Sequence, residues 1–184
     1  EINNKYFPLK PGTEYVYEGF TREGSNQIPH SIIFTVTDLT KEVAGIQTVV
    51  AYIIDYSDGE LVEAEIAFYA QDNDGNVWFM GEYPEVYEFG EVVEAPAWIP
   101  PLKGAKAGIV MKADPQPDMP SYAQGWGPAV GWDDRGRVVS SGEKTCVPVA
   151  CYEDVLITEE FSHAEPDAAQ VKHYAPGVGN IQVT

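Results

Sequence analysis

The sequence predicts an all-β protein built as a single antiparallel β-barrel or as one strongly curved sheet. Between residues 44 and 82, alternating apolar and polar residues are interrupted by Ser57-Asp58-Gly59-Glu60 and by Asp72-Asn73-Asp74-Gly75-Asn76. Asp-Gly turns between alternating segments are a strong hairpin signal. The 17 Gly, 14 Pro and 11 Tyr residues also favour many short strands over helices. No segment has sustained helical periodicity.

The alternation locates the strands in order along the chain. In the strand at 31–39, the phase turns Phe34 toward the interior. In the strand at 61–71, Ile66 and Phe68 share one face while Glu63 and Glu65 lie on the other, so we expect the glutamates to face solvent. The other predicted strands are 14–20, 46–55, 77–82, a hairpin at 85–93, 108–112, 121–126, 138–141, 145–148, 152–161, 169–174 and 178–183.

About ten strands with near-neighbour connections favour a calycin-like sheet, because closure or strong curvature removes exposed edges. The length of 184 residues suits a single β-barrel-like domain over 1–184. Residues 1–5 are expected to form an N-terminal tether. Residues 95–128 contain many prolines and are predicted to form a loop excursion over one end. The hairpin between the runs 152–161 and 169–174 is expected to turn at Glu165-Pro166, and the next break is expected at Ala175-Pro176-Gly177.

The charge is strongly negative, at −18 from 29 acidic and 11 basic side chains. Such a field repels phosphate backbones and anionic lipid surfaces, so nucleic acid is not an expected partner. Membrane insertion is not expected either, because no apolar run approaches the length of a membrane helix. Cationic ligands and divalent metals remain compatible with the charge. The oligomeric state is left open.

Cys146 and Cys151 are the only cysteines, and they flank a turn between two strand-like runs. A spacing of five across a reversal brings Cα atoms close enough for a disulfide, which we predict here. A reduced pair and a metal dithiolate are the alternatives. A disulfide favours a secreted, periplasmic or cell-surface location. The chain starts at Glu1, so we expect that a signal peptide has been removed.

Two motifs resemble a group of bacterial secreted proteins and lipoproteins that have no assigned activity. Residues 6–17 read YFPLKPGTEYVY and residues 174–179 read YAPGVG. The resemblance implies an exported β-rich domain with a wrapped or barrel-like sheet, and it implies no catalytic residues. In the cysteine turn, the resemblance places a glycine at the position of Ala150. A disulfide that holds a turn without its glycine is therefore our hypothesis for this pair.

The three histidines, His30, His163 and His173, are candidate metal ligands if barrel closure brings the first and last strands together. Three imidazoles suit zinc or copper, which makes a metal-dependent enzyme or metalloprotein one alternative function. Isolated surface or hydrogen-bonded histidines are the other interpretation. The Asp72 loop has the oxygen density of a calcium site, but Tyr83 occupies the twelfth position, so we predict a hairpin turn. No cofactor is otherwise indicated.

Aromatic residues give the main functional hypothesis, since they gather in or beside the proline-rich excursion. Stacking on such rings suits a small apolar, aromatic or glycan-like ligand. The alternative is that the rings fill the barrel end as core. No catalytic residue is identified, so we expect an exported non-catalytic binding or interaction module; a structural subunit of an extracellular or envelope assembly is a further alternative. The candidate ligand-binding residues are Trp98, Tyr122, Trp126, Trp132 and Tyr87.

Overall fold

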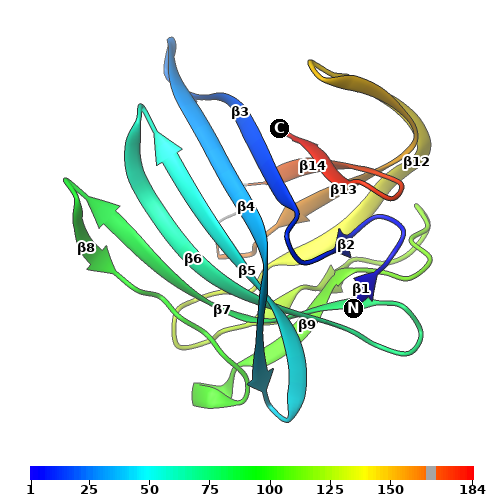
Figure 1. Ribbon diagram of the computed structural model, residues 1–184, viewed down its shortest axis with the longest axis horizontal. Coiled ribbons are helices and arrows are strands. Elements are labelled where there is room, and N and C mark those ends of the chain that lie inside the picture. The colour runs from blue at the N-terminus through cyan, green and yellow to red at the C-terminus, as the bar shows by residue number, and fades with distance from the viewer. Residues whose placement is uncertain (165–168) are drawn as a thin grey trace.

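The computed structural model describes residues 1–164 and 169–184, which form the strand-rich molecule in Figure 1. Strands make up 67% of it, and the predicted all-β class is confirmed. The expected turn at Glu165-Pro166 lies outside the described residues. Among the described residues, no helix is both long enough and apolar enough to cross a membrane.

The larger sheet curls into a half-barrel. Seven of its antiparallel strands turn through 183°, which fits the predicted curved sheet or barrel. In spatial order these are β11 (Gly125–Trp126), β9 (Lys106–Met111), β7 (Val77–Glu88), β6 (Glu60–Gln71), β5 (Ile46–Ser57), β4 (Asn26–Val43) and β3 (Glu14–Glu23), and β8 (Glu91–Glu94) also pairs with β7.

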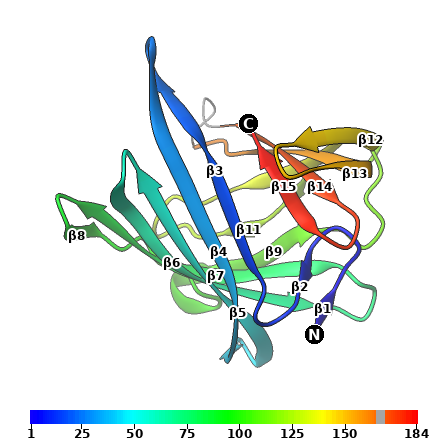
Figure 2. The ribbon, with the colours of Figure 1, turned by 45° about the horizontal axis from the view of Figure 1, so that its top comes forward.

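A second sheet of five strands faces this half-barrel (Figure 2). Its order is β10 (Tyr122–Ala123), β12 (Arg135–Val147), β13 (Ala150–Phe161), β14 (Gln170–Ala175) and β15 (Gly179–Val183). On one side, only Gln124 separates β10 from β11 of the larger sheet. On the other side, the Tyr17 hydroxyl of β3 donates to the carbonyl of Asn180 on β15 over 2.9 Å. The two sheets therefore enclose one shared interior.

One apolar core runs through both sheets. It includes Ala67 and Tyr69 from β6 and Leu156 and Tyr174 from the second sheet. Phe34 packs against this core, so its predicted inward orientation is confirmed. The segments Ile2–Asn3 (β1) and Pro8–Leu9 (β2) pair with each other at the edge of the core.

The faces of β6 are the reverse of the expectation. Ala67 and Tyr69 lie in the shared core, and strand alternation puts Glu63 and Glu65 on that same inner face. Phe68 instead packs in a separate outer cluster, and Ile66 is 39% exposed. The prediction that the glutamates face solvent was therefore wrong, because the outer cluster, and not the interior, takes the larger apolar side chains of this strand.

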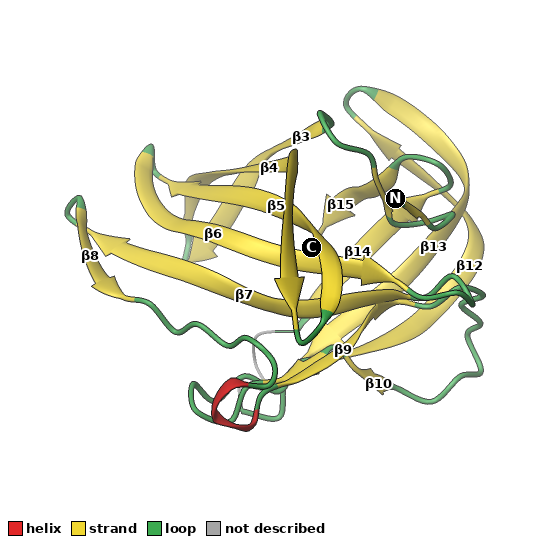
Figure 3. Ribbon diagram, turned by 60° about the horizontal axis from the view of Figure 1, so that its bottom comes forward, coloured by secondary structure: helices red, strands yellow, loops and turns green. Residues whose placement is uncertain are grey.

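The N-terminal residues do not form a free tether. Ile2 is buried in the core, and the Asn4 side chain donates to the carbonyls of Gly75 and Lys112 over 2.9 and 3.1 Å. Residues 95–128, predicted as an excursion, contribute β9, β10 and β11 to the sheets. Figure 3 shows the long connection from β8 to β9, which carries a short 3-10 helix, η1 (Leu102–Gly104).

Two predicted strand breaks are absent. The runs 77–82 and 85–88 belong to one strand, β7. The run 138–141 and the run 145–148, up to its last residue, belong to β12, which ends at Val147. Each long strand absorbs register shifts as bulges. The hairpin turn at Phe89-Gly90 occurs as predicted, with Phe89 at φ 51° and Gly90 at φ 81°.

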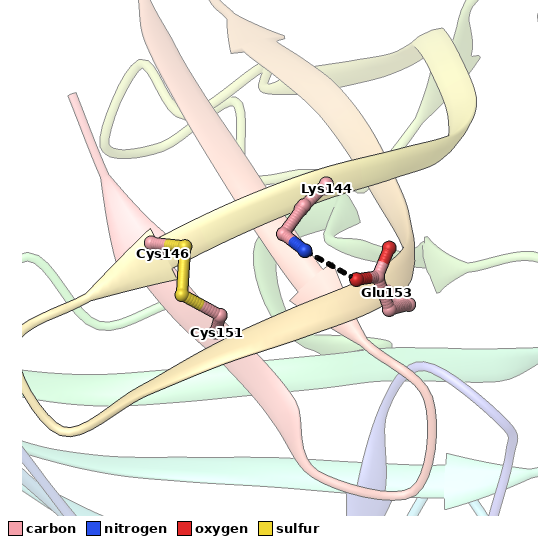
Figure 4. The surroundings of a disulfide bond; sticks show 4 residues. All are labelled: Lys144, Cys146, Cys151 and Glu153. Atoms are coloured by element: carbon pink, nitrogen blue, oxygen red, sulfur yellow. Dashed lines mark hydrogen bonds and ion pairs between the residues drawn. A yellow bond between two sulfur atoms is a disulfide. The ribbon is translucent and has the colours of Figure 1, made fainter.

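The predicted disulfide is present between Cys146 of β12 and Cys151 of β13 (Figure 4). The two residues are direct cross-strand partners with Cα atoms 4.0 Å apart. Lys144 and Glu153 form an ion pair nearby at 2.6 Å. Ala150 is not in the left-handed region, so the turn does not require the glycine that the resemblance places there. The disulfide therefore ties one hairpin at the end of the second sheet.

Candidate functional site

The inner face of the half-barrel carries a row of carboxylates. Glu65 lies opposite Ile53 of β5, and Glu63 lies opposite Asp55, so three acidic side chains occupy neighbouring inner positions. All three are only partly exposed. Along β6 the inner face therefore changes from aromatic, at Tyr69, to acidic at Glu65 and Glu63.

A bulge in β7 adds Glu82 to this face. Between the pairs Ala67 with Glu82 and Tyr69 with Phe79, β7 contains one residue more than β6. The bulge includes Gly81 at φ 109°, where an added Cβ would lie 2.5 Å from the Trp98 carbonyl oxygen. A bulge re-aims the side chains that follow it. Only glycine allows the approach that brings Glu82 and Trp98 together.

Glu82 is held by Trp98 in three ways. The backbone groups of the two residues exchange hydrogen bonds of 3.0 and 3.2 Å. The Trp98 indole Nε1 also donates to Glu82 Oε1 over 2.8 Å. This last bond favours the ionised form of Glu82, because a carboxylate is the better acceptor.

Glu65 and Glu82 are diagonal neighbours on β6 and β7, and their carboxyl groups form a hydrogen bond. Such a bond requires a proton on one partner. Burial and the neighbouring Glu82 hold the pKa of Glu65 well above its usual range. Burial also raises the pKa of Glu82 to about 7, although the bonds from Glu65 and Trp98 oppose this shift. Both shifts therefore favour a proton that the pair shares.

The opposite wall of the interior carries a carboxylate with its own cation. Glu160 of β13 forms an ion pair with Lys172 of β14 and accepts a 2.9 Å hydrogen bond from the Gln124 amide. The positive charge of Lys172 also lowers the pKa of Glu65, so the two walls are within electrostatic reach of each other. Thr158 lies beside this pair, 3% exposed, and its Oγ1 has no hydrogen-bond partner among the described residues.

Further along the concave face, His30 Nε2 lies 3.2 Å from Asp55 Oδ1. Burial raises the pKa of Asp55, and the His30 charge only partly offsets this. Burial and the charge of Asp55 likewise raise the pKa of Glu63. The acidic face thus favours a bound proton or cation wherever its carboxylates are removed from water.

Tyrosine hydroxyl groups complete the polar lining. Burial raises the pKa of these tyrosines, so their hydroxyls stay protonated and serve as neutral donors and acceptors. The charge of Glu160 adds to this shift for three of them. The four residues are Tyr17, Tyr69, Tyr122 and Tyr174.

The aromatic end of the interior is filled by its own side chains. Trp98 is 3% exposed and stacks on Trp132 with ring centroids 4.5 Å apart. Phe79 contacts both rings edge to face. A Cβ at Gly125 would lie 2.5 Å from the Trp98 ring, and one at Gly127 would lie 2.8 Å from the Trp98 side chain. Trp98 and Trp132 therefore pack as core at this end.

The other predicted ligand-binding aromatics lie elsewhere. Trp126 is 46% exposed on β11. The Tyr87 hydroxyl donates to Glu85 over 2.8 Å on β7. Tyr122 packs over Gly136, with Lys112 Nζ 5.2 Å from its ring centroid. Of the five candidates, only Trp98 and Trp132 form a stacked pair.

The three histidines have separate partners. His30 faces Asp55, His173 Nδ1 lies 2.9 Å from Thr145 Oγ1, and His163 lies 3.9 Å from Asp133. Over residues 1–164 and 169–184, no group of three or more His, Cys, Asp or Glu side chains is placed to hold a metal ion. The structure does not assemble the predicted metal site.

The Asp72 loop is a hairpin turn, as predicted. Asp72 Oδ1 accepts from the backbone of Asp74 and Asn76, and Oδ2 accepts from the Asn76 amide and the Trp78 indole. These bonds lower the pKa of Asp72. The oxygens that resembled calcium ligands are used within the turn.

Comparison of the chain with protein-family models, with curated proteins and with solved structures gave no match. The resemblance to secreted bacterial β-domains therefore stays a prediction. Sequence reasoning did not single out Glu65, Glu82, Glu160 or Lys172. Their one available signal was Tyr69, an aromatic residue on the same face of β6 as the glutamates, which suggested that this face was not simply solvated.

Proposed function

We propose that this chain is a non-catalytic binding module that holds a small ligand on the concave face of its half-barrel. The observation that carries the proposal is the hydrogen-bonded pair Glu65 and Glu82, kept on that face by a glycine bulge and by Trp98. Burying two carboxyls side by side costs stability and adds nothing to the core. A binding role accounts for that cost.

The proposed site is the acidic face, and not the tryptophans that the sequence indicated. Trp98 and Trp132 already stack on each other, so their faces are occupied by protein. The acidic face offers partly exposed carboxyl groups and tyrosine hydroxyls beside apolar Ile53. A small ligand with both polar and apolar parts fits this lining. The disulfide supports our further proposal that the module works outside the cytoplasm, where disulfides persist.

Chemical-shift mapping tests this proposal. We would titrate isotope-labelled protein with short-chain amines, alcohols and sugars and follow the backbone amides. Perturbations centred on the inner positions of β5, β6 and β7, with the added compound recovered unchanged, are the expected result. Perturbations centred on Trp126 and the outer face, or chemical conversion of a compound, would contradict the proposal.

A further inference from the structure

We propose that the concave face recognises an organic ammonium group, which binds between Glu65 and Glu82 on neighbouring strands of the half-barrel. This inference rests on the proposed function and names its ligand class. It starts from a difference between the glutamates of the interior. Glu160 is neutralised by Lys172, whereas no described lysine, arginine or histidine forms an ion pair with Glu65 or Glu82.

The Lys172 contact shows how this interior accommodates an ammonium group. Lys172 Nζ meets Glu160, and Gln124 satisfies the other carboxylate oxygen. Across the interior, the carboxyl group of Glu82 similarly accepts a hydrogen bond from the Trp98 indole. It also hydrogen-bonds to the carboxyl group of Glu65. A ligand ammonium that replaced the shared proton would give both carboxylates the charge-assisted bonds that Glu160 already has.

A second observation, independent of the acids, also indicates a ligand. Thr158 is only 3% exposed, and its Oγ1 has no hydrogen-bond partner among residues 1–164 and 169–184. Strand alternation places it on the inner face with Leu156 and Glu160, directly opposite Lys172. A buried hydroxyl without a hydrogen-bond partner destabilises the free protein. The ligand ammonium group has three N–H donors, and one of them would supply the missing partner.

The residues beside Glu65 indicate the rest of the ligand. Glu65 lies between Ile53 of β5 and Pro84 of β7 in one cross-strand row, and Pro84 is buried. Ile32 lies on the same inner face, opposite Asp55. These apolar neighbours fit a short hydrocarbon body next to the ammonium group. The ligand class is therefore an alkylamine or a similar organic amine.

Charge balances in the exchange. Before binding, the pair carries one proton and one negative charge. Binding brings one positive charge, and the proton leaves to solvent, so both carboxylates are ionised in the complex and the net charge of the site is unchanged. Because a proton is released, affinity rises with pH. The titratable and charged groups that interact with the pair are Glu63, Asp134, Lys172 and Tyr69. Asp55 with His30, and Glu160, lie next to these groups.

Calorimetry with hexylammonium is the test. Binding is measured at pH 8 in two buffers of different ionisation enthalpy, which reports the protons released. Hexanol and hexanoate, of the same length, are the uncharged and anionic controls. We expect hexylammonium alone to bind, with release of about one proton. Glu65→Gln and Glu82→Gln should each weaken binding by about tenfold or more, because each removes one charged partner.

The exposed Glu88→Gln, on the same strand as Glu82, is the matched control for overall charge, and its affinity should stay unchanged. Melting temperatures confirm that each variant is folded. Equal binding of hexylammonium and hexanol without proton release would overturn the ammonium site and leave the binding module standing. An equal loss of affinity in Glu88→Gln would also overturn it. No binding of any of the three compounds would overturn the ammonium site, and the binding module would fall with it if the titration with amines, alcohols and sugars also perturbed no amide of the inner face.

Discussion

The interior of this barrel has an aromatic half and an acidic half, and β6 runs through both. At Tyr69 the strand joins a series of rings in which Tyr69 stacks on Phe79 at 5.1 Å. Four residues earlier, at Glu65, the same inner face presents a carboxyl to Glu82, and burial and Glu82 raise the pKa of this carboxyl. The aromatic half buries apolar surface and stabilises the fold, whereas the desolvated carboxyls of the acidic half destabilise it. Along β6, the residues that stabilise the fold and the residues of the proposed binding site therefore occupy different parts of one strand.

Trp98→Ala should have the largest effect on stability, because it removes a large buried ring from the aromatic half. Loss of a buried tryptophan costs about 3–5 kcal/mol. Denaturant unfolding of Trp98→Ala would measure this loss. The matched control is Trp126→Ala, at a half-exposed ring, which should change stability by less than about 1 kcal/mol. Equal losses in the two variants would contradict the assignment of Trp98 to the core.

Glu82→Gln should stabilise the protein above pH 7, because the acidic half opposes folding there. The pKa of Glu82 rises from its ordinary value of 4.5 to about 7 in the folded protein. The folded state therefore holds more protons, and the free energy of unfolding is greatest below about pH 4.5 and falls as pH rises through about 7. At 1.36 kcal/mol per pKa unit, the loss approaches about 3 kcal/mol.

Thermal unfolding between pH 4.5 and pH 8.5 measures this dependence. The wild type should lose stability across the interval, and Glu82→Gln should lose less. Glu88→Gln, with an exposed side chain, should follow the wild type. Identical profiles for wild type and Glu82→Gln would show that this carboxyl is not desolvated.

Reduction of the disulfide should have a smaller effect, since the bond lies in neither half of the interior. Cys146 and Cys151 close a short hairpin loop, and closing a loop of this size contributes about 2 kcal/mol in the chain-entropy model. Melting with and without a phosphine reductant measures the loss. An unfolded protein after reduction would show that the fold depends on the bond, against this account.

Thr158→Val should have the smallest effect, a gain of up to about 1 kcal/mol in the free protein. The variant removes a buried hydroxyl that lacks a partner and keeps the side-chain shape. Denaturant unfolding measures it, with Thr145→Val as the control, because Thr145 Oγ1 contacts His173 and its loss should destabilise. A large loss of unfolding free energy in Thr158→Val would show that the hydroxyl stabilises the free protein and is not left for a ligand.

Local patterns predicted most of the fold. The Asp-Gly turns, the hairpin at Phe89-Gly90 and the paired cysteines all depend on neighbours in sequence, and the structure contains each of them. Strand ends were less accurate because bulges let β7 and β12 continue where alternation broke. The position of a bulge depends on contacts with other strands, so the local sequence pattern does not predict it.

The candidate site was not predicted, for a related reason. Alternation in β6 separates two faces but does not say which one lies inside. That choice depends on the outer cluster that takes Phe68 and on the core that takes Tyr69. The side chain of Glu82 points into the interior because of the bulge at Gly81. Lys172 of β14 pairs with Glu160 of β13, and both strands are distant in sequence from β6 and β7. These are long-range contacts.

The most direct test of the account is the titration of the Glu65 and Glu82 side chains by carbon-detected NMR, with Glu65→Gln and Glu82→Gln providing the assignments. We predict that Glu82 titrates near pH 7 and that the pKa of Glu65 lies well above 4.5, so that the pair holds a proton in neutral solution. Ionisation of both carboxyls near pH 4.5 would contradict the shared proton, and with it the acidic half as a site for an ammonium group.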